Sequence, residues 1–144
     1  MKSLFSPKDV VHVVGISYRQ LQYWDKTDFI KPTAIQLGKY RNYTFQELVQ
    51  MKLAKILREQ HVSIQKLRKV IESVKDLLVR VGCPLSDCSF LIDGEKVLLF
   101  NGDVVMDSDS SHSFFRFDVK SLRQDIDRVF PDKDKSPVAH SAAS

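Results

Sequence analysis

The residues best suited to chemistry in this sequence lie on a short predicted helix at 18–26. Its outward-facing side chains are Tyr18, Arg19, Gln20, Gln22, Tyr23 and Lys26. Arginine pairs with guanine or phosphate, glutamine pairs with adenine, and tyrosine hydroxyls bind phosphate oxygens. The set therefore favours recognition of a nucleic acid.

A second basic and aromatic cluster lies at 39–43, within a segment at 34–43 that predicts a small hairpin or wing. Such a cluster beside a helix suits contact with the phosphate backbone or the minor groove. The residues expected to touch a nucleic acid are Tyr18, Arg19, Gln22, Tyr23, Lys39, Arg41 and Tyr43.

The distribution of charge supports the same class of partner. Residues 1–81 contain 15 Lys and Arg against 7 Asp and Glu, whereas residues 82–144 contain 7 against 11. Neutralising phosphates releases counterions, so a basic segment of this kind favours a polyanionic partner.

The flanking sequence predicts the elements that hold this helix in place. Ser6 starts a first short helix, which Gly15 ends because glycine tolerates the left-handed backbone of a tight turn. Ser17 caps the second helix, which buries Leu21 and Trp24. A helix, a turn containing glycine and a second polar helix form the geometry that lets one helix enter the major groove.

Two longer helices follow the predicted wing. Thr44 and Glu47 form a capping box for the first, which extends to about Gln60. Ser63 caps the second, which ends at Gly82. Its apolar residues recur at spacings of three and four and are Ile64, Leu67, Ile71, Val74, Leu78 and Val81. This heptad seam is either an interface or the face that covers the winged helix, and the sequence leaves both open.

The character of the sequence changes after Gly82. Short apolar runs bounded by turn residues predict strands at 90–92, 96–100, 104–106 and 113–117, followed by a closing helix at 119–130. Asp93-Gly94 and Asn101-Gly102 predict hairpin turns with those pairs as central residues, because both positions favour positive φ. The expected fold class is mainly α with small β. The expected organisation is a winged helix at 1–81, a small strand-rich appendage at 82–130 and a mobile tail at 131–144.

These motifs, in this order, resemble the MerR family of transcriptional regulators. The run Val14–Asp25 (VGISYRQLQYWD) is similar to the family's recognition segment, and Phe29–Pro32 (FIKP) to its exit. Arg41–Thr44 (RNYT), with Gln46–Leu48 (QEL), resembles the wing and the helix that follows it. The resemblance covers about residues 5–75.

The resemblance implies a winged helix-turn-helix that binds double-stranded DNA. Arg19 and Tyr23 would contact DNA from the recognition helix, with Tyr18 close to bases or phosphate. Arg41 and Tyr43 would be phosphate contacts of the wing. The family further implies a nucleoid-associated regulator of transcription, which acts as a homodimer on an inverted repeat and distorts the promoter. The low number of cysteines makes the cytoplasm the expected location.

Three features depart from the family pattern. Gln22 stands where the family usually has Arg, which removes one cationic contact, and Asp28 stands where it usually has Gly. The family's long pairing helix is missing, because the heptad helix stops at Gly82 and a strand-rich segment follows.

Two other functions stay open. One is a DNA-tethered adaptor or antitoxin, in which residues 82–130 bind another protein through an exposed strand edge. The other is an architectural or excision-type accessory protein that bends DNA without responding to a signal.

Catalysis, cofactors, a metal site and a membrane span are not expected. The sequence has no phosphate-cradling glycine loop, nucleophile elbow or metalloprotease helix. Cys83 and Cys88 fit no common zinc spacing; some metal-sensing relatives place thiolates after a helix end, and Cys88 suits a small core position equally well. Asp107, Asp109 and Asp118 suit a solvated acidic region. No apolar run is long enough to cross a bilayer, and two cysteines do not make a disulfide framework.

Overall fold

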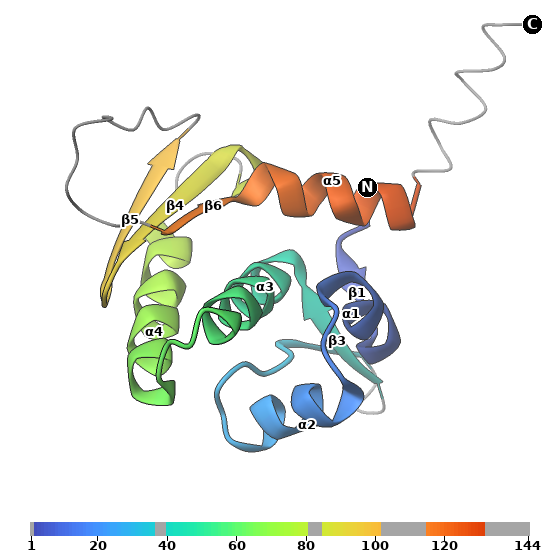
Figure 1. Cartoon of the computed structure of the whole chain (residues 1–144). Coiled ribbons are helices and arrows are strands. Elements are labelled where there is room, and N and C mark those ends of the chain that lie inside the picture. Colours follow the sequence, from blue (N-terminus) through green and yellow to red (C-terminus); the bar gives the residue numbers. More distant parts are fainter. Residues whose placement is uncertain (1, 37–39, 81–84, 102–114, 132–144) are drawn as a thin grey trace, which may run out of the picture.

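The computed structural model describes residues 2–36, 40–80, 85–101 and 115–131 and is mostly helical (Figure 1). Its helices are α1 (Pro7–Val14), α2 (Tyr18–Lys26), α3 (Phe45–Glu59), α4 (Ile64–Arg80) and α5 (Val119–Val129), with a short 3-10 turn at Leu85–Asp87. Its strands are β1 (Leu4–Phe5), β2 (Ala34–Gln36), β3 (Tyr40–Thr44), β4 (Cys88–Asp93), β5 (Lys96–Asn101) and β6 (Phe115–Asp118). The expected fold class, mainly helical with small sheets and a closing helix, is confirmed.

The first two helices begin and end where their capping residues predict. The hydroxyl of Ser6 accepts a hydrogen bond from the Asp9 amide at 3.1 Å, and the Asp9 carboxylate accepts one from the Ser6 amide at 3.1 Å. Gly15 follows α1 with a φ of 81°, in the left-handed region that favours glycine. The Ser17 hydroxyl then caps α2 by accepting from the Gln20 amide at 3.0 Å. The predicted turn between α1 and α2 is confirmed.

The predicted wing is confirmed as the hairpin β2–β3, which belongs to a small sheet of strand order β1-β3-β2. Antiparallel pairing aligns Ile35 with Arg41 across the hairpin. On the other side of β3, the short strand β1 places Phe5 opposite Tyr43. A strand of two residues carries no periodicity of its own, so the sequence did not predict it.

The C-terminal sheet has the strand order β5-β4-β6, with both outer strands antiparallel to β4. The predicted turn at Asp93-Gly94 is displaced by one residue. Asp93 pairs with Lys96, so the central residues are Gly94 and Glu95. Only the first of them, Gly94, has a positive φ, 62°, which is the requirement of a turn with glycine at its first central position.

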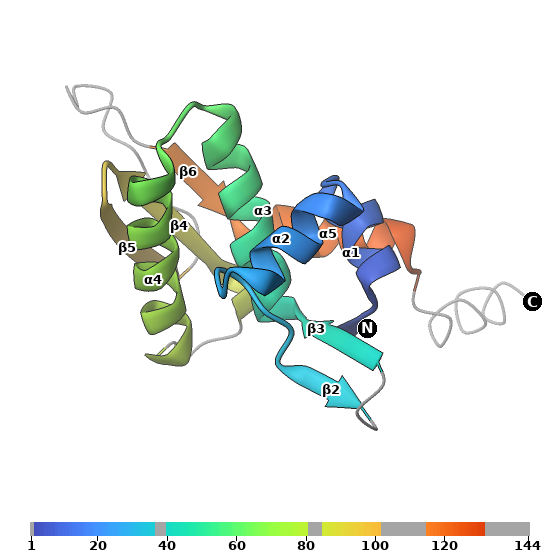
Figure 2. The same cartoon turned by 90° about the horizontal axis from the view of Figure 1, so that it is seen from below.

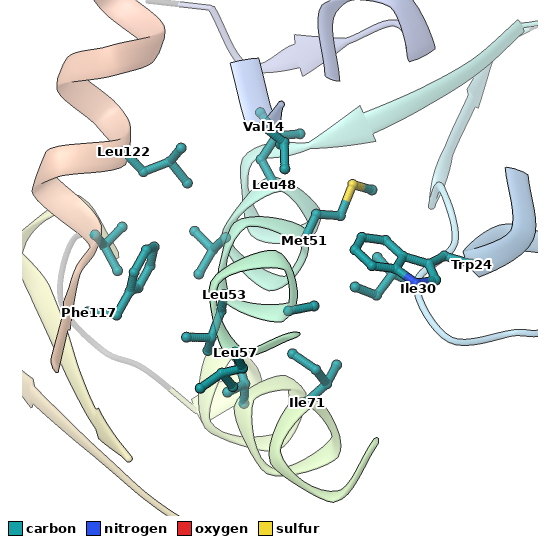
Figure 3. Close-up of a cluster of buried hydrophobic side chains, with 14 of the residues drawn as sticks. Val14, Trp24, Ile30, Leu48, Met51, Leu53, Leu57, Ile71, Phe117 and Leu122 are labelled. Atoms are coloured by element: carbon teal, nitrogen blue, oxygen red, sulfur yellow. The ribbon is translucent and has the colours of Figure 1, made fainter. Parts of the chain in front are cut away.

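Helix α3 lies at the centre of the core (Figure 3). Its side chains Leu48, Met51, Leu53 and Leu57 are all buried. A helix that is apolar around much of its circumference must be covered by several elements. In Figure 3 these include Trp24 from α2, Ile71 from α4 and Phe117 from β6. The predicted burial of Leu21 and Trp24 is confirmed.

The heptad seam of α4 faces the interior. Leu67, Ile71, Val74 and Leu78 are buried, and α4 lies against α3 and β5. Lys69 and Glu95 form an ion pair of 3.6 Å between α4 and the β4–β5 turn. Ile64 is the exception, since 47% of its surface is exposed. Over the residues described, the seam is therefore the covering face, which settles one of the questions that the sequence leaves open.

Helix α5 returns to the start of the chain (Figure 1). The buried guanidinium of Arg123 donates a hydrogen bond to the Lys2 carbonyl at 3.0 Å and lies 4.9 Å from the centre of the Phe45 ring. The Lys2 ammonium lies 5.0 Å from the centre of the Phe130 ring. The first residues of the chain and its closing helix thus hold one another in place.

One cluster of buried side chains extends from Phe5 to Ile126. The division into separate parts at residues 81 and 82 stays a prediction. Several other predictions fall outside the described residues, namely the strand at 104–106, Gly102 of the turn predicted at Asn101-Gly102, Val81 of the heptad seam, the acidic residues Asp107 and Asp109, and the tail from 132 onward. No helix in the described ranges is long and apolar enough to cross a membrane.

Candidate nucleic-acid interface

Helix α2 has one buried face and one exposed face. Leu21 and Trp24 lie in the core, whereas four predicted contacts are exposed. These four are Tyr18, Arg19, Gln22 and Tyr23, and we call them the α2 face. Its two tyrosines are 51% and 57% exposed, so their rings and hydroxyls are available to a ligand.

The exposed side of α2 carries two positive charges, those of Arg19 in the α2 face and of Lys26 near the end of the helix. None of the ion pairs between described residues includes Arg19 or Lys26. The first amides of α2 add the partial positive charge of a helix N-terminus. Both features favour an anion such as phosphate beside this helix.

The turn after α2 accommodates Asp28, where the resemblance leads one to expect glycine. Asp28 has a φ of 60°, in the left-handed region, which aspartate enters more readily than most side chains. The Lys31 ammonium lies 2.7 Å from its carboxylate. The hydrogen bond and the charge of Lys31 hold the pKa of Asp28 below its usual value. The turn thus keeps the backbone conformation that glycine would supply.

The wing places its three predicted contacts differently. Lys39 lies outside the described residues. The structure describes only the backbone of Arg41, which lies in β3 and pairs with Ile35 of β2. Tyr43 is only 2% exposed and lies across from Phe5 in the core. Its contact with phosphate stays a prediction, and the buried side chain belongs to the main cluster of apolar residues.

The wing and α2 lie on the same side of the molecule. Figures 1 and 2 show the β2–β3 hairpin projecting beside α2, while α5 and the C-terminal sheet lie on the far side of α3. A helix and a neighbouring hairpin on one surface can reach a groove and the flanking phosphates of one duplex.

Two arginines extend this basic surface beyond the predicted residues. Arg58 at the end of α3 and Arg68 in α4 line a cavity of about 240 Å³ beside α2, together with Tyr23 and Ile64. Both arginines are exposed, and the Arg68 guanidinium lies 5.3 Å from the centre of the Phe29 ring. In the sequence they resemble ordinary charges on the polar faces of two helices. Only the packing of α2, α3 and α4 brings them together.

The described residues contain no cluster of metal-ligating side chains. Cys88 is buried in β4, and Cys83 lies outside the described ranges. Asp118 accepts hydrogen bonds from the Ser89 hydroxyl at 2.7 Å and from Arg116 at 2.9 Å. Partial burial acts to raise the pKa of Asp118, but these hydrogen bonds and the Arg116 charge outweigh it and hold the pKa below its usual value. Asp118 therefore serves to join β6 to β4.

Comparison with known proteins matches residues 5–74 to a family described as MerR HTH family regulatory protein. The uncharacterized HTH-type transcriptional regulators Rv1830 of Mycobacterium tuberculosis and Mb1861 of Mycobacterium bovis are each 28% identical to this chain over 88 residues. Those residues are 59% of this chain and 38% of each relative, so the match spans well under half the length of the curated relatives.

Among solved structures, the HTH-type transcriptional regulator SkgA from Caulobacter crescentus is similar to 56% of this chain over 63% of its own length. That similarity has a TM-score of 0.42 and a sequence identity of 21%.

Proposed function

We propose, from the premise that residues 5–74 are a MerR-family helix-turn-helix domain, that this chain regulates transcription by binding double-stranded DNA through α2 and the wing. The observation that carries the proposal is the division of α2 into two faces. Its apolar side is anchored in the core, and its exposed side gathers an arginine, a glutamine and two tyrosines. These are the groups that read base edges and phosphates.

Each residue of the α2 face has a role that its chemistry supports. Arg19 pairs with a guanine edge or a phosphate, and Gln22 pairs with adenine. The hydroxyls of Tyr18 and Tyr23 bind phosphate oxygens and fix the register on the duplex. Lys39 and Arg41 of the wing neutralise the phosphates that flank the groove.

The proposed complex is a dimer on an inverted repeat, with distortion of the promoter as part of its mechanism. Two-fold symmetry of the protein requires matching symmetry in the operator, and distortion lets DNA shape contribute to specificity. Because the apolar seam of α4 is buried within the chain, a dimer must use another surface.

The first test is selection of bound duplexes from a random pool with the wild-type chain. We expect an enriched inverted repeat, affinity that falls steeply with salt, and a footprint with two-fold symmetry. Sedimentation equilibrium of the selected complex gives its stoichiometry, and energy transfer between dyes at the duplex ends reports distortion. A pool with no enriched sequence, together with binding that salt does not weaken, contradicts the proposal.

A second candidate function, recruitment of a protein partner, is favoured by one observation on the C-terminal sheet. Among the described strands of this sheet β5 is an outer one, and its side chains Leu98 and Phe100 are 44% and 38% exposed. An apolar strand at a sheet edge is a template for pairing with another chain. Residues 82–130 could in this way tether a partner to DNA.

This candidate is tested on the full chain with Leu98→Lys, and with Val79→Lys as the control at another exposed apolar residue. We expect a stoichiometric partner to co-purify with the wild type and the control and to be lost from Leu98→Lys. If the two variants retain the partner equally, or no partner co-purifies with any of them, the β5 edge has no such role.

A further inference from the structure

A single buried carboxylate holds both ends of the wing. Glu47, on the first turn of α3, is 5% exposed. Its Oε1 accepts hydrogen bonds from the Thr44 amide at 2.9 Å and from the Thr33 amide at 3.4 Å. Its Oε2 accepts from the Thr44 hydroxyl at 2.8 Å and from the Thr33 hydroxyl at 3.0 Å. Thr33 directly precedes β2 and Thr44 ends β3, so the two threonines mark the entry and the exit of the wing.

Only half of this arrangement is needed to start α3. The bond from the Thr44 amide to Glu47 spans three residues and belongs to the capping box that the sequence predicts. The Thr44 hydroxyl adds a second bond to the same carboxylate. The bonds to Thr33 reach back fourteen residues and satisfy no helix amide. They join the segment that leaves α2 to the helix that follows the wing, and this link needs another explanation.

We propose that Glu47 is a positioning residue for DNA binding, which fixes the wing relative to the α2 face. The proposal rests on the proposed function. α2 is anchored by Leu21 and Trp24, and the Lys75 ammonium donates a 2.8 Å hydrogen bond to the Phe29 carbonyl just after it. The wing, in contrast, projects from the body (Figure 2). Hydrogen bonds that tie both ends of the wing to α3 set the direction in which the wing projects from the body. That direction in turn sets the distance between the residues of α2 and those of the wing that contact a duplex.

The chain itself offers a variant that separates helix capping from wing positioning. At the start of α1, Asp9 forms a capping box with Ser6, with both hydrogen bonds at 3.1 Å. An aspartate in the same helical position therefore suffices to start a helix in this protein. Glu47→Asp keeps the box with Thr44, but its side chain is one methylene shorter and withdraws from Thr33.

Glu47→Gln is the matched rescue. Its amide oxygen can accept from the two threonine amides, and its amide nitrogen can donate to the two hydroxyl oxygens, since a hydroxyl both donates and accepts. All four contacts are then retained without the charge. Thr33→Val is a further variant that removes one hydroxyl bond and leaves α3 unchanged.

The experiment measures affinity for a duplex selected by the wild-type chain, as a function of salt, with thermal unfolding of each variant as the check on folding. We expect Glu47→Asp to weaken binding about fivefold to tenfold. We expect it to reduce the salt slope by about one, which is also the change we expect for Arg41→Ala, a variant that removes one phosphate contact of the wing. Glu47→Gln should bind within about twofold of the wild type, and Thr33→Val should weaken binding by about half as much in free energy as Glu47→Asp.

Double variants distinguish positioning from a general loss of structure. If Glu47 acts through the wing, adding Glu47→Asp to Arg41→Ala costs little more, whereas adding it to Arg19→Ala costs its full factor. The proposal is overturned if Glu47→Asp and Thr33→Val both bind like the wild type, if Glu47→Gln is as weak as Glu47→Asp, or if the two double variants lose affinity equally. A failure of the proposed function looks different, because Arg19→Ala would then bind DNA as well as the wild type does.

Discussion

Helices α2 and α4 share an amphipathic pattern, but the side chains on their polar faces have different partners. Each has an apolar stripe in the core and basic residues opposite it. On α4, Lys69 pairs with Glu95 and Lys75 donates to a backbone carbonyl, so these charges support the fold. On α2, Arg19 takes part in no ion pair among the described residues and stands beside two exposed tyrosines. Amphipathicity thus identifies the buried face, and the partners of each polar side chain distinguish the charges that support the fold from those that are available to a ligand.

The apolar faces teach a second difference. The stripe of α2 is short and is completed by the Trp24 ring, whose centre lies 5.6 Å from that of Phe29. The stripe of α4 has the heptad spacing that suits helix pairing, yet it lies under α3 and β5 of its own chain. Heptad spacing therefore does not distinguish an interface between chains from one within a chain.

The largest expected effect tests the buried seam of α4. Ile71→Ala should lower the free energy of unfolding by about 2–4 kcal/mol, because it leaves a cavity between α4 and the core. Ile64→Ala, on the same helix but half exposed, is the control and should cost well under half as much. Chemical denaturation measures both. A transition that shifts with protein concentration for the wild type and not for Ile71→Ala would show that the seam is an interface between chains.

The next effect tests the polar face of α2. Arg19→Ala should weaken binding to the selected duplex by about 1–3 kcal/mol and reduce discrimination at one base position. Arg128→Ala is a matched control on α5, where the arginine is exposed and pairs with Asp125 at 3.3 Å. Competition binding against single-base variants of the duplex measures affinity and specificity together. Equal affinity of the two arginine variants would remove Arg19 from the interface.

A smaller effect tests whether the basic surface extends to the end of α3. Arg58→Ala should weaken binding to all duplexes by a similar factor and lower the salt slope by about one, since its chemistry suits phosphate. Arg80→Ala is the control, because that arginine is exposed at the end of α4 and bonds to a carbonyl of its own helix. Binding titrations at several salt concentrations measure this. If affinity depends on salt with the same slope in both variants, Arg58 does not contact the DNA.

The smallest effect concerns pH and the C-terminal sheet. Because the pKa of Asp118 is lowered in the folded protein, its contribution to stability is present above its ordinary pKa and is lost as the pH falls through the lower folded value. We expect Asp118→Asn to be slightly less stable than the wild type near neutral pH, and the difference to shrink in acid below about pH 4. Solvent screening keeps the effect small, since the side chains of Asp118 and Arg116 are each more than one third exposed. Unfolding curves across this range measure it, and a difference that grows in acid would contradict it.

Much of the winged half could be predicted because its signals are local. Ser6, Gly15 and Ser17 act within a few residues of their own position, so the ends of α1 and the start of α2 follow from the sequence. The exposed positions of the α2 face follow from the burial of Leu21 and Trp24 on the same helix. The turn after β4 was misplaced by one residue because Gly94 supports positive φ at either central position, and only the pairing of Asp93 with Lys96 selects one of them.

The remaining features of the site depend on contacts between distant residues. Tyr43 belongs to a basic and aromatic cluster in the sequence, which is typical of a surface contact, but it is buried where β3 pairs with β1. Arg58 joins the basic surface only because α3 ends beside α2. The bonds from Thr33 to Glu47 cross fourteen residues, and a capping box accounts for Glu47 without them.

By itself, the sequence determined which segments of the winged half become helices and hairpin, and which side of α2 is polar. Capping, turn preference and periodicity act over three to five residues, and so they can be recognised in the sequence. The tertiary structure decided what each surface contacts. The apolar seam of α4 lies in the core of its own chain, Tyr43 of β3 is buried in that core, and both ends of the wing bond to Glu47. Apolar faces and hydrogen-bonding groups are not specific to a partner, so the partner is chosen only when the whole chain is packed.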